Sequence, residues 1–155
     1  MRWNLRFDVV LALAALAGCL SPSDDRPGLR LRGETVEALP ADWSFTDQFP
    51  EIELEVDAPV FRHSVTIWCS AMEGVLYVGG RAPETKRWTR LVGRDPNVRL
   101  RIGGRIYDVA LVPVEDPDVG ERVRLAYTRK YKLPAPTLSS SPVSMRYWRV
   151  MPRPD

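Results

Sequence analysis

The fold of this chain is decided by the stretch Asn97-Val98-Arg99-Leu100-Arg101-Ile102-Gly103-Gly104-Arg105-Ile106-Tyr107-Asp108-Val109-Ala110. Apolar and charged residues alternate strictly from Val98 to Ile102, which is the pattern of a half-buried strand. Gly103-Gly104 supplies a two-residue turn, because glycine adopts the positive φ angles that tight hairpins need. The apolar run Ile106–Val114 returns as a longer strand. The stretch therefore predicts a β-hairpin.

A second hairpin is predicted upstream. Glu51–Asp57 alternates so that its three aliphatic residues share one face and its four acidic residues share the other. Ser64–Ala71 and Val75–Gly79 then flank the turn Glu73-Gly74. We expect the acidic row to be solvated on an open sheet face, and we predict no metal site there.

Two helices and a closing strand are predicted around these hairpins. Lys86–Val92 carries apolar residues at helical spacing and is followed by Gly93, which favours a short helix. Asp116-Pro117 pairs an N-cap with proline at the first helical position and predicts a helix over residues 117–131. Ser144–Met151 alternates as a last strand. The fold class is mainly β (α+β), a small antiparallel β-barrel with two helices.

The N-terminus is typical of an export signal. Arg2 and Arg6 precede the apolar run Val9–Ala17, which is too short to span a bilayer. The run ends in Leu16-Ala17-Gly18-Cys19, which resembles the lipobox of bacterial lipoproteins, in which cleavage precedes a cysteine that is acylated on its thiol. We therefore expect lipidation at Cys19. An ordinary secretory signal, with Cys19 a bystander, is the alternative.

This signal divides the chain into three segments: residues 1–18 as signal peptide, 19–34 as lipidated cysteine and flexible tether, and 35–155 as the folded domain. The membrane is then a partner through the N-terminal lipid. Leu20 stands where an aspartate would retain a lipoprotein in the inner membrane of many Gram-negative species. We expect a cell-envelope location, at the outer membrane and facing the periplasm.

Composition excludes several kinds of site. The 155-residue chain has one His and two Cys, too few for a multi-residue zinc cage, an iron–sulfur cluster or a disulfide framework. A formal net charge of +2 argues against nucleic acid as the main partner. If Cys19 carries lipid, Cys69 has no intrachain partner, and its place in an apolar run indicates a buried, unreactive thiol.

Residues 60–151 resemble the split β-barrel proteins, which include pyridoxamine-phosphate-oxidase-like flavoproteins and deazaflavin-dependent nitroreductases. The likeness rests on a strand, a short helix, a loop with a following strand and a glycine turn: Gly74-Val75-Leu76-Tyr77-Val78-Gly79, Lys86-Arg87-Trp88 with Leu91, Asp95-Pro96-Asn97-Val98-Arg99-Leu100 and Gly103-Gly104-Arg105. It implies an antiparallel split barrel that binds FMN or a deazaflavin. It also implies a ligand site that is closed across a homodimer.

Members of this family hold the cofactor phosphate with basic and small polar residues from the strand before the first hairpin and from the short helix. The resemblance places Lys86, Arg87 and Trp88 in such a cofactor site. The other candidate cofactor residues are Arg62, His63 and Ser64, where a strand opens at the expected barrel mouth, and Arg81, where a strand ends. A basic first turn is unfavourable in the helix dipole, so an anion beside Lys86 and Arg87 is expected to compensate. Trp88 is either a core residue or a cofactor-stacking residue. No residue is assigned a catalytic role.

Three functions stay open at this stage. The domain is a membrane-tethered flavin- or deazaflavin-type oxidoreductase, a non-catalytic envelope module that binds a small ligand or a protein partner, or a remnant of the fold without a ligand. Arg90 stands where the nitroreductases have asparagine, so a flavin, a deazaflavin and no cofactor are comparable alternatives. An anion-binding mouth would favour the first function, and an exposed apolar patch the second.

Overall fold

The hairpin predicted at residues 97–114 is present in the computed structural model, which describes residues 27–134 and 144–154. Strand β5 (Asn97–Ile102) and strand β6 (Arg105–Pro113) pair antiparallel, with Ile102 opposite Arg105. Gly103 and Gly104 have φ angles of 57° and 81°, as a two-residue hairpin turn requires.

The remaining elements follow the predicted order, with small additions. The other strands are β1 (Glu34–Thr35), β2 (Ile52–Val56), β3 (His63–Met72), β4 (Val75–Arg81) and β7 (Met145–Met151). The helices are α2 (Arg87–Val92) and α3 (Pro117–Tyr131), with 3₁₀ turns η1 (Ser44–Gln48) and η2 (Pro83–Thr85). The predicted strands and helices are therefore confirmed to within a few residues at each end.

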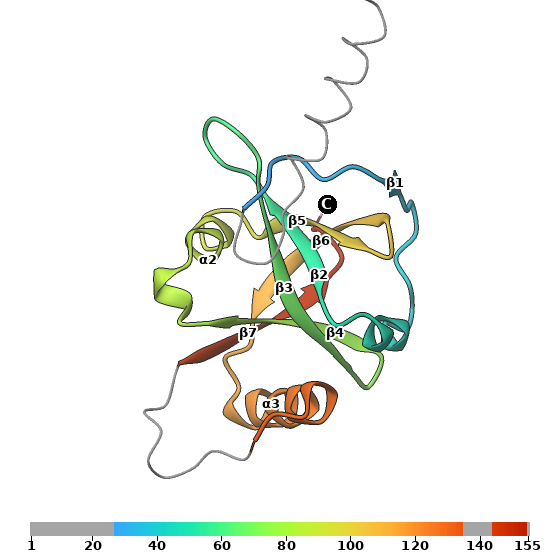
Figure 1. Cartoon of the computed structure of the whole chain (residues 1–155), viewed down its shortest axis with the longest axis vertical. Helices are drawn as coiled ribbons and strands as arrows, with labels where there is room; N and C mark the ends of the chain where they lie inside the picture. Colours follow the sequence, from blue (N-terminus) through green and yellow to red (C-terminus); the bar gives the residue numbers. More distant parts are fainter. Residues whose placement is uncertain (1–26, 135–143, 155) are drawn as a thin grey trace, which may run out of the picture.

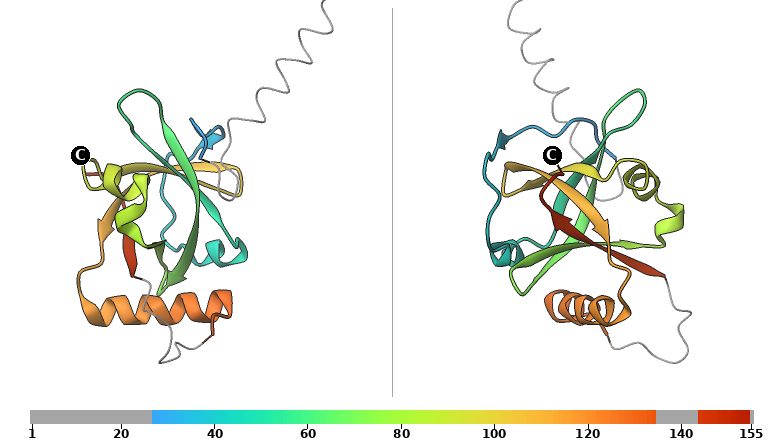
Figure 2. Two further views of the ribbon diagram at one scale, coloured as in Figure 1. Left: turned by 60° about the vertical axis from the view of Figure 1, so that its left-hand side comes forward. Right: turned by 180° about the vertical axis from the view of Figure 1, so that it is seen from behind.

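Six strands close into an antiparallel barrel (Figures 1 and 2). The order is β6-β5-β2-β3-β4-β7, and β7 pairs back onto β6 through Ala110–Met151 and Leu111–Val150. β1 is an extra two-residue strand that runs parallel to β6. This confirms the predicted fold class, and closure leaves no exposed edge in the six-stranded ring.

The inward-facing residues form one apolar core. Leu54, Val78, Leu100 and Val109 are completely buried, one from each of four strands. Helix α2 adds Trp88, Leu91 and Val92 to the same cluster. The alternation in the sequence predicted this inward face because side chains point to opposite sides of a strand at successive positions.

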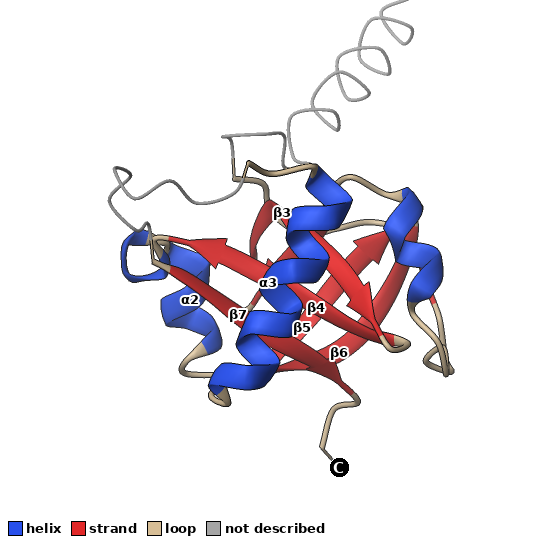
Figure 3. Cartoon of the chain, turned by 90° about the horizontal axis from the view of Figure 1, so that it is seen from below, coloured by secondary structure: helices blue, strands red, loops and turns tan. Residues whose placement is uncertain are grey.

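Helix α3 lies across the strands at one end of the barrel, as Figure 3 shows. The Asp116 carboxylate accepts hydrogen bonds from the backbone N–H groups of Asp118 and Val119, which caps the helix as predicted. Val123 and Tyr127 face the barrel and form a second, smaller apolar cluster with Tyr77 and Tyr147. This cluster fixes α3 against β4 and β7.

The predicted tether, residues 19–34, contacts the barrel through Gly28 and Leu31 in its described part, although its other described residues are exposed. Leu31 is 2% exposed, and its backbone N–H donates to the Glu55 carboxylate. Gly28 forms an antiparallel bridge with Ser64 through two backbone hydrogen bonds. The prediction of a flexible tether is therefore wrong for residues 28–34, because a local polar composition does not reveal contacts with strands far along the chain.

The acidic row of β2 also differs from its prediction. Glu55 is 1% exposed, and its carboxylate lies 2.9 Å from Arg99 Nη1 and 3.4 Å from Arg62 Nη1. Glu53 pairs with Arg101 on β5. The expectation of a solvated row is wrong for these two residues, because residues 28–34 and the arginines of β5 cover this face.

The thiol of Cys69 is buried, as predicted. Burial raises its pKa to about 11, and the neighbouring Lys130 ammonium, 3.5 Å from Sγ, offsets only part of that rise. The thiol is therefore protonated near neutral pH, and it is a poor nucleophile.

The predicted signal peptide (residues 1–18) and Cys19 lie outside the described residues. Within residues 27–134 and 144–154, no helix is both long enough and apolar enough to cross a bilayer.

Candidate functional site

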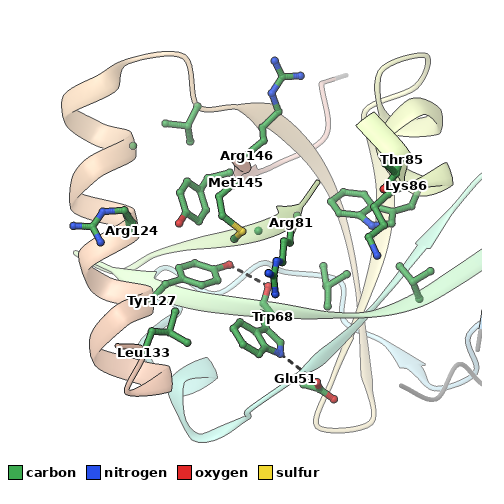
Figure 4. Close-up of a pocket in the computed structure, with 18 of the residues that line it drawn as sticks. Glu51, Trp68, Arg81, Thr85, Lys86, Arg124, Tyr127, Leu133, Met145 and Arg146 are labelled. Atoms are coloured by element: carbon green, nitrogen blue, oxygen red, sulfur yellow. Dashed lines mark hydrogen bonds between the residues drawn. The ribbon is translucent and has the colours of Figure 1, made fainter. Parts of the chain in front are cut away.

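An open groove runs between the outer surface of β3 and β4, the start of α2, the side of α3 and the start of β7. It encloses about 1220 Å³. Figure 4 shows its walls, with α3 on one side and the α2 segment on the other. The groove is large enough for a cofactor-sized ligand, for which binding cavities are typically about 300–1000 Å³.

Four exposed cations line the α2 side of this groove. Arg81 ends β4, Arg146 lies on β7 next to it, and Lys86 and Arg87 begin α2. Figure 4 shows the side chains of Arg81 and Lys86 both reaching into the groove. Among the described residues, none of the four has a carboxylate within 4.0 Å. Arg81 and Lys86 therefore share one space without an ion-pair partner among the described residues, whereas the Arg146 side chain points away from them in Figure 4.

Local backbone geometry brings three of these cations together. Ala82 adopts a left-handed conformation (φ 46°, ψ 58°), which turns the chain from β4 into η2 and then into α2. In the β4–β7 ladder, Arg146 stands opposite Gly80. The result is that the end of β4 and the start of α2 present Arg81, Lys86 and Arg87 to one space, whereas Arg146 lies on the other face of the ladder from Arg81.

Helix α2 begins without the usual stabilising features. Lys86 is its N-cap residue, its side chain makes no capping hydrogen bond, and the first turn holds no acidic residue. The Thr89 hydroxyl donates to the Lys86 carbonyl, which leaves the helix start still uncapped. A cation at this position is unfavourable in the helix dipole and lacks the oxygen acceptor that a good N-cap provides.

His63, the first residue of β3, also lines the groove. Partial burial lowers the pKa of its imidazole below the ordinary value of 6.5, and the positive charge of Arg87 lowers it further. The imidazole is therefore neutral near pH 7, with one nitrogen able to donate and the other able to accept a hydrogen bond.

Trp88 packs as a core residue, which was one of its two predicted roles. It is 4% exposed, and its ring lies 4.9 Å from the ring of Trp148. A Cβ atom on Gly80 would approach Trp88 to 3.0 Å, so the glycine is needed for this contact. The indole reaches the groove only as part of its floor.

The aromatic wall near α3 was not predicted as part of the site. Trp68 is 40% exposed and stacks on Tyr131 with ring centroids 4.3 Å apart. Its indole N–H donates to Glu51 at 3.3 Å, and its carbonyl accepts from the Tyr127 hydroxyl at 3.0 Å, as drawn in Figure 4. Strand alternation places Trp68 opposite to Ile67 and Cys69, and that signal would have identified it as an outward-facing aromatic residue.

The structure brings together five of the seven predicted cofactor residues and separates the other two. The five that line the groove are His63, Arg81, Lys86, Arg87 and Trp88. Arg62 instead pairs with Asp57 at 2.6 Å and with Glu55 at 3.4 Å. Ser64 is fully buried opposite Glu55, and its hydroxyl has no hydrogen-bond partner among the described residues.

No cluster of metal ligands accompanies the groove. Within the described part of the chain, there is no group of three or more His, Cys, Asp and Glu side chains that could hold a metal ion.

Comparison with known proteins identifies a family and a fold. A family model described as "Uncharacterized protein conserved in bacteria (DUF2255)" matches residues 47–146, which is more than half of the 155-residue chain. No curated protein has a sequence that matches this chain.

Two solved structures share the fold at low sequence identity. A candidate pyridoxamine 5'-phosphate oxidase from Listeria innocua superposes with a TM-score of 0.53 at 16% identity, covering 70% of this chain and 88% of its own. A NimC/NimA family protein from Clostridium acetobutylicum gives 0.51 at 12% identity, covering 69% and 74%. These similarities support the split-barrel fold that the sequence resemblance implied.

Proposed function

We propose that this chain, which belongs to the DUF2255 family, binds the phosphate of FMN or of a deazaflavin in the groove between β4, α2 and β7. The observation that carries the proposal is that Arg81, Lys86 and Arg87 line one space without carboxylate partners among the described residues. A phosphate accepts charge-assisted hydrogen bonds from such groups. The split-barrel fold, shared with a candidate pyridoxamine 5'-phosphate oxidase, supports a flavin-type ligand.

The groove residues fit such a cofactor in charge and offer an aromatic surface to its ring. Arg81 and Lys86 reach into the groove and would hold the phosphate, while the neutral imidazole of His63 would hydrogen-bond to a polar edge. Trp68 offers an exposed aromatic surface for a planar ring on the opposite wall. When bound, a flavin supplies hydride or single-electron transfer, and this chain would supply binding and orientation.

A titration of the full chain in detergent micelles with FMN, followed by flavin fluorescence, tests the proposal. We expect saturable binding that is much weaker for riboflavin, which lacks the phosphate. Arg81→Ala and Lys86→Ala should each weaken FMN binding about 10- to 100-fold, because a hydrogen bond to a charged group contributes about 1.5–3 kcal/mol. Arg105→Ala, which removes an exposed arginine outside the groove, should leave the affinity unchanged.

The same titration separates the alternatives. Equal binding of FMN and riboflavin, or no saturable binding of either, would overturn the proposed phosphate site. Inorganic phosphate that displaces FMN and binds as tightly as FMN would show that the flavin ring contributes nothing to affinity. That result would instead favour a non-catalytic module that binds a small anion. A deazaflavin titrated in parallel decides between the two cofactors.

We also propose that the chain is a lipoprotein of the cell envelope, anchored through Cys19 in the outer membrane and facing the periplasm. The support is the sequence alone: a basic start, a short apolar run and Leu16-Ala17-Gly18-Cys19. Globomycin, which inhibits the lipoprotein signal peptidase, and the variant Cys19→Ser should both block processing. A Cys19→Ser protein that is still cleaved and released would contradict the anchor.

A homodimer is the oligomeric state we propose for the ligand-bound form. Three partly exposed apolar residues, Trp68, Leu133 and Met145, line the groove and would be covered by a second copy. Sedimentation of the full chain in detergent should show a dimer in the presence of FMN. A strictly monomeric protein with bound FMN would overturn this part of the proposal.

A further inference from the structure

The loop between β2 and β3, residues 57–62, carries the two most exposed large apolar side chains among the described residues. Val60 is 78% exposed and Phe61 is 69% exposed. The other exposed large apolar residues lie between 37% and 47%. Figures 1 and 2 show this loop projecting from the end of the barrel that is opposite to α3. Water is an unfavourable environment for a valine and a phenylalanine at such a tip.

The base of this loop is fixed, so that its tip is held away from the barrel. Arg62 forms an ion pair with Asp57 at 2.6 Å across the loop. Directly below, Val56 stands opposite His63 in the β2–β3 ladder. These contacts leave Val60 and Phe61 at the tip, where the described residues provide no apolar surface to cover them.

The described chain begins beside the base of the same loop. Gly28 and Ser64 exchange two backbone hydrogen bonds, at 2.8 and 3.0 Å, and Ser64 follows the loop by two residues. Cys19 precedes Gly28 by nine residues. Nine residues span at most about 30 Å when fully extended. A lipid on Cys19 would therefore hold the bilayer close to this end of the barrel.

We propose that Val60 and Phe61 insert into the interface of the bilayer that holds the Cys19 lipid, as a second, weaker membrane contact. This inference rests on the proposed lipid anchor. Two side chains alone bind a membrane weakly, but a short covalent connection to the lipid makes their insertion an intramolecular event at high effective concentration. The insertion orients the barrel, with α3 turned away from the membrane surface.

The test uses a fluorescent reporter on the full, acylated chain in vesicles of phosphatidylethanolamine and phosphatidylglycerol. Phe61→Cys is labelled with the polarity-sensitive dye NBD, and Leu125→Cys on α3 is the matched control at an exposed position on the opposite end. The buried thiol of Cys69, with its pKa raised to about 11, does not compete for the label. Both labelling positions are accessible, since Phe61 is 69% exposed and Leu125 is 45% exposed.

The expected result is a blue shift of NBD emission at position 61 on addition of vesicles and loss of that emission when lipids carrying nitroxides are included. The label at position 125 should show neither change. Protein that floats with the vesicles but gives the same emission at both positions would overturn the membrane contact while leaving the anchor intact. Protein that does not float would overturn the anchor, and this inference with it.

Contact of the loop tip with a second copy of the chain, rather than with a membrane, would give a different signal. A blue shift at position 61 that appears without vesicles and grows with protein concentration would assign Val60 and Phe61 to contact between two copies of the chain. That result would also overturn the proposal.

Discussion

Two groups of cations in this molecule differ in whether carboxylates of the fold neutralise them. On the outer face of β5, Arg99 and Arg101 pair with Glu55 and Glu53 across the β2–β5 ladder. Their side chains are only 14% and 21% exposed. The four cations of the groove are exposed, and no carboxylate lies within 4.0 Å of them among the described residues. The first group is neutralised within the fold, and the second is not.

The difference separates charges that support the fold from charges that are accessible to a ligand. A buried arginine without its carboxylate would be strongly destabilising, so the β5 pairs are part of the folding energetics. Neighbouring cations without carboxylates, such as Arg81, Lys86 and Arg87, repel one another and destabilise the folded state slightly. Functional sites commonly carry such a stability cost, and an anion in the groove would remove it.

The largest expected effect is at the neutralised cluster. Glu55→Ala should lower the free energy of unfolding by about 3 kcal/mol. It removes the buried carboxylate that faces Arg99, leaving only the more exposed Asp108 at 3.6 Å, and it leaves the Leu31 N–H without its acceptor. Urea denaturation of the full chain measures this change.

The control for the Glu55–Arg99 ion pair is an exposed ion pair with a similar N···O distance. Glu73 and Arg122 lie 3.0 Å apart, but their side chains are 71% and 53% exposed. Glu73→Ala should cost no more than about 1 kcal/mol. Equal losses for the two variants would show that burial does not distinguish the clusters.

The strands and helices could be predicted from the sequence because their signals are local. Alternation identified β2 and β5, glycines identified the turn at residues 103–104, and Asp116-Pro117 identified the start of α3. Each of these signals lies within a few neighbouring residues. The packed segment around Leu31 could not be predicted, because its partner Glu55 is 24 residues away and no local pattern encodes that contact.

The site was predictable in part for the same reason. Lys86 and Arg87 stand next to each other at a helix start whose charge is unfavourable, and that anomaly is visible in the sequence. Arg146, which also lines the groove, was missed because only the β4–β7 register places it opposite Gly80, on the other face of the ladder from Arg81. Grouping Ser64 with His63 was incorrect in physical terms, since adjacent residues of a strand point to opposite faces.

The floor of the groove is packed as tightly as the β2–β5 face, although its rim is open. Gly80→Ala would place a Cβ 3.0 Å from Trp88 and 3.3 Å from Trp148, so we expect a loss of about 1–3 kcal/mol in unfolding free energy. Gly120→Ala on α3 meets no atom within 4 Å and should be neutral or stabilising. Thermal denaturation of both variants checks this contrast, which would fail if Gly80→Ala were as stable as the parent.

Removing a groove cation should raise the free energy of unfolding, whereas removing Glu55 should lower it. Lys86→Ser replaces a poor N-cap of α2 by a good one and removes one of the neighbouring positive charges. We expect the free energy of unfolding to rise by about 0.5–1 kcal/mol while FMN binding weakens. A Lys86→Ser protein that is less stable than the parent would show that Lys86 supports the fold, and the distinction between the two groups would fail at this position.

The smallest effect is the titration of His63, the single histidine of the chain. Its pKa lies below 6.5 in the folded protein because of partial burial and then because of Arg87. As the pH falls, the unfolded chain takes up this proton first, so the contribution of His63 to stability is complete above pH 6.5 and is lost as the pH falls from 6.5 through the folded pKa.

NMR of the one imidazole measures this pKa directly. Arg87→Gln should raise it only part of the way toward 6.5, since burial remains, and FMN binding should raise it further because a nearby phosphate favours the imidazolium. The β5 arginines provide the contrast, because their charges are already neutralised and Arg101→Gln should leave the His63 pKa unchanged. If Arg87→Gln also leaves it unchanged, Arg87 does not face His63 in solution. The groove cations would then not converge, and the phosphate site built on them would lose its basis.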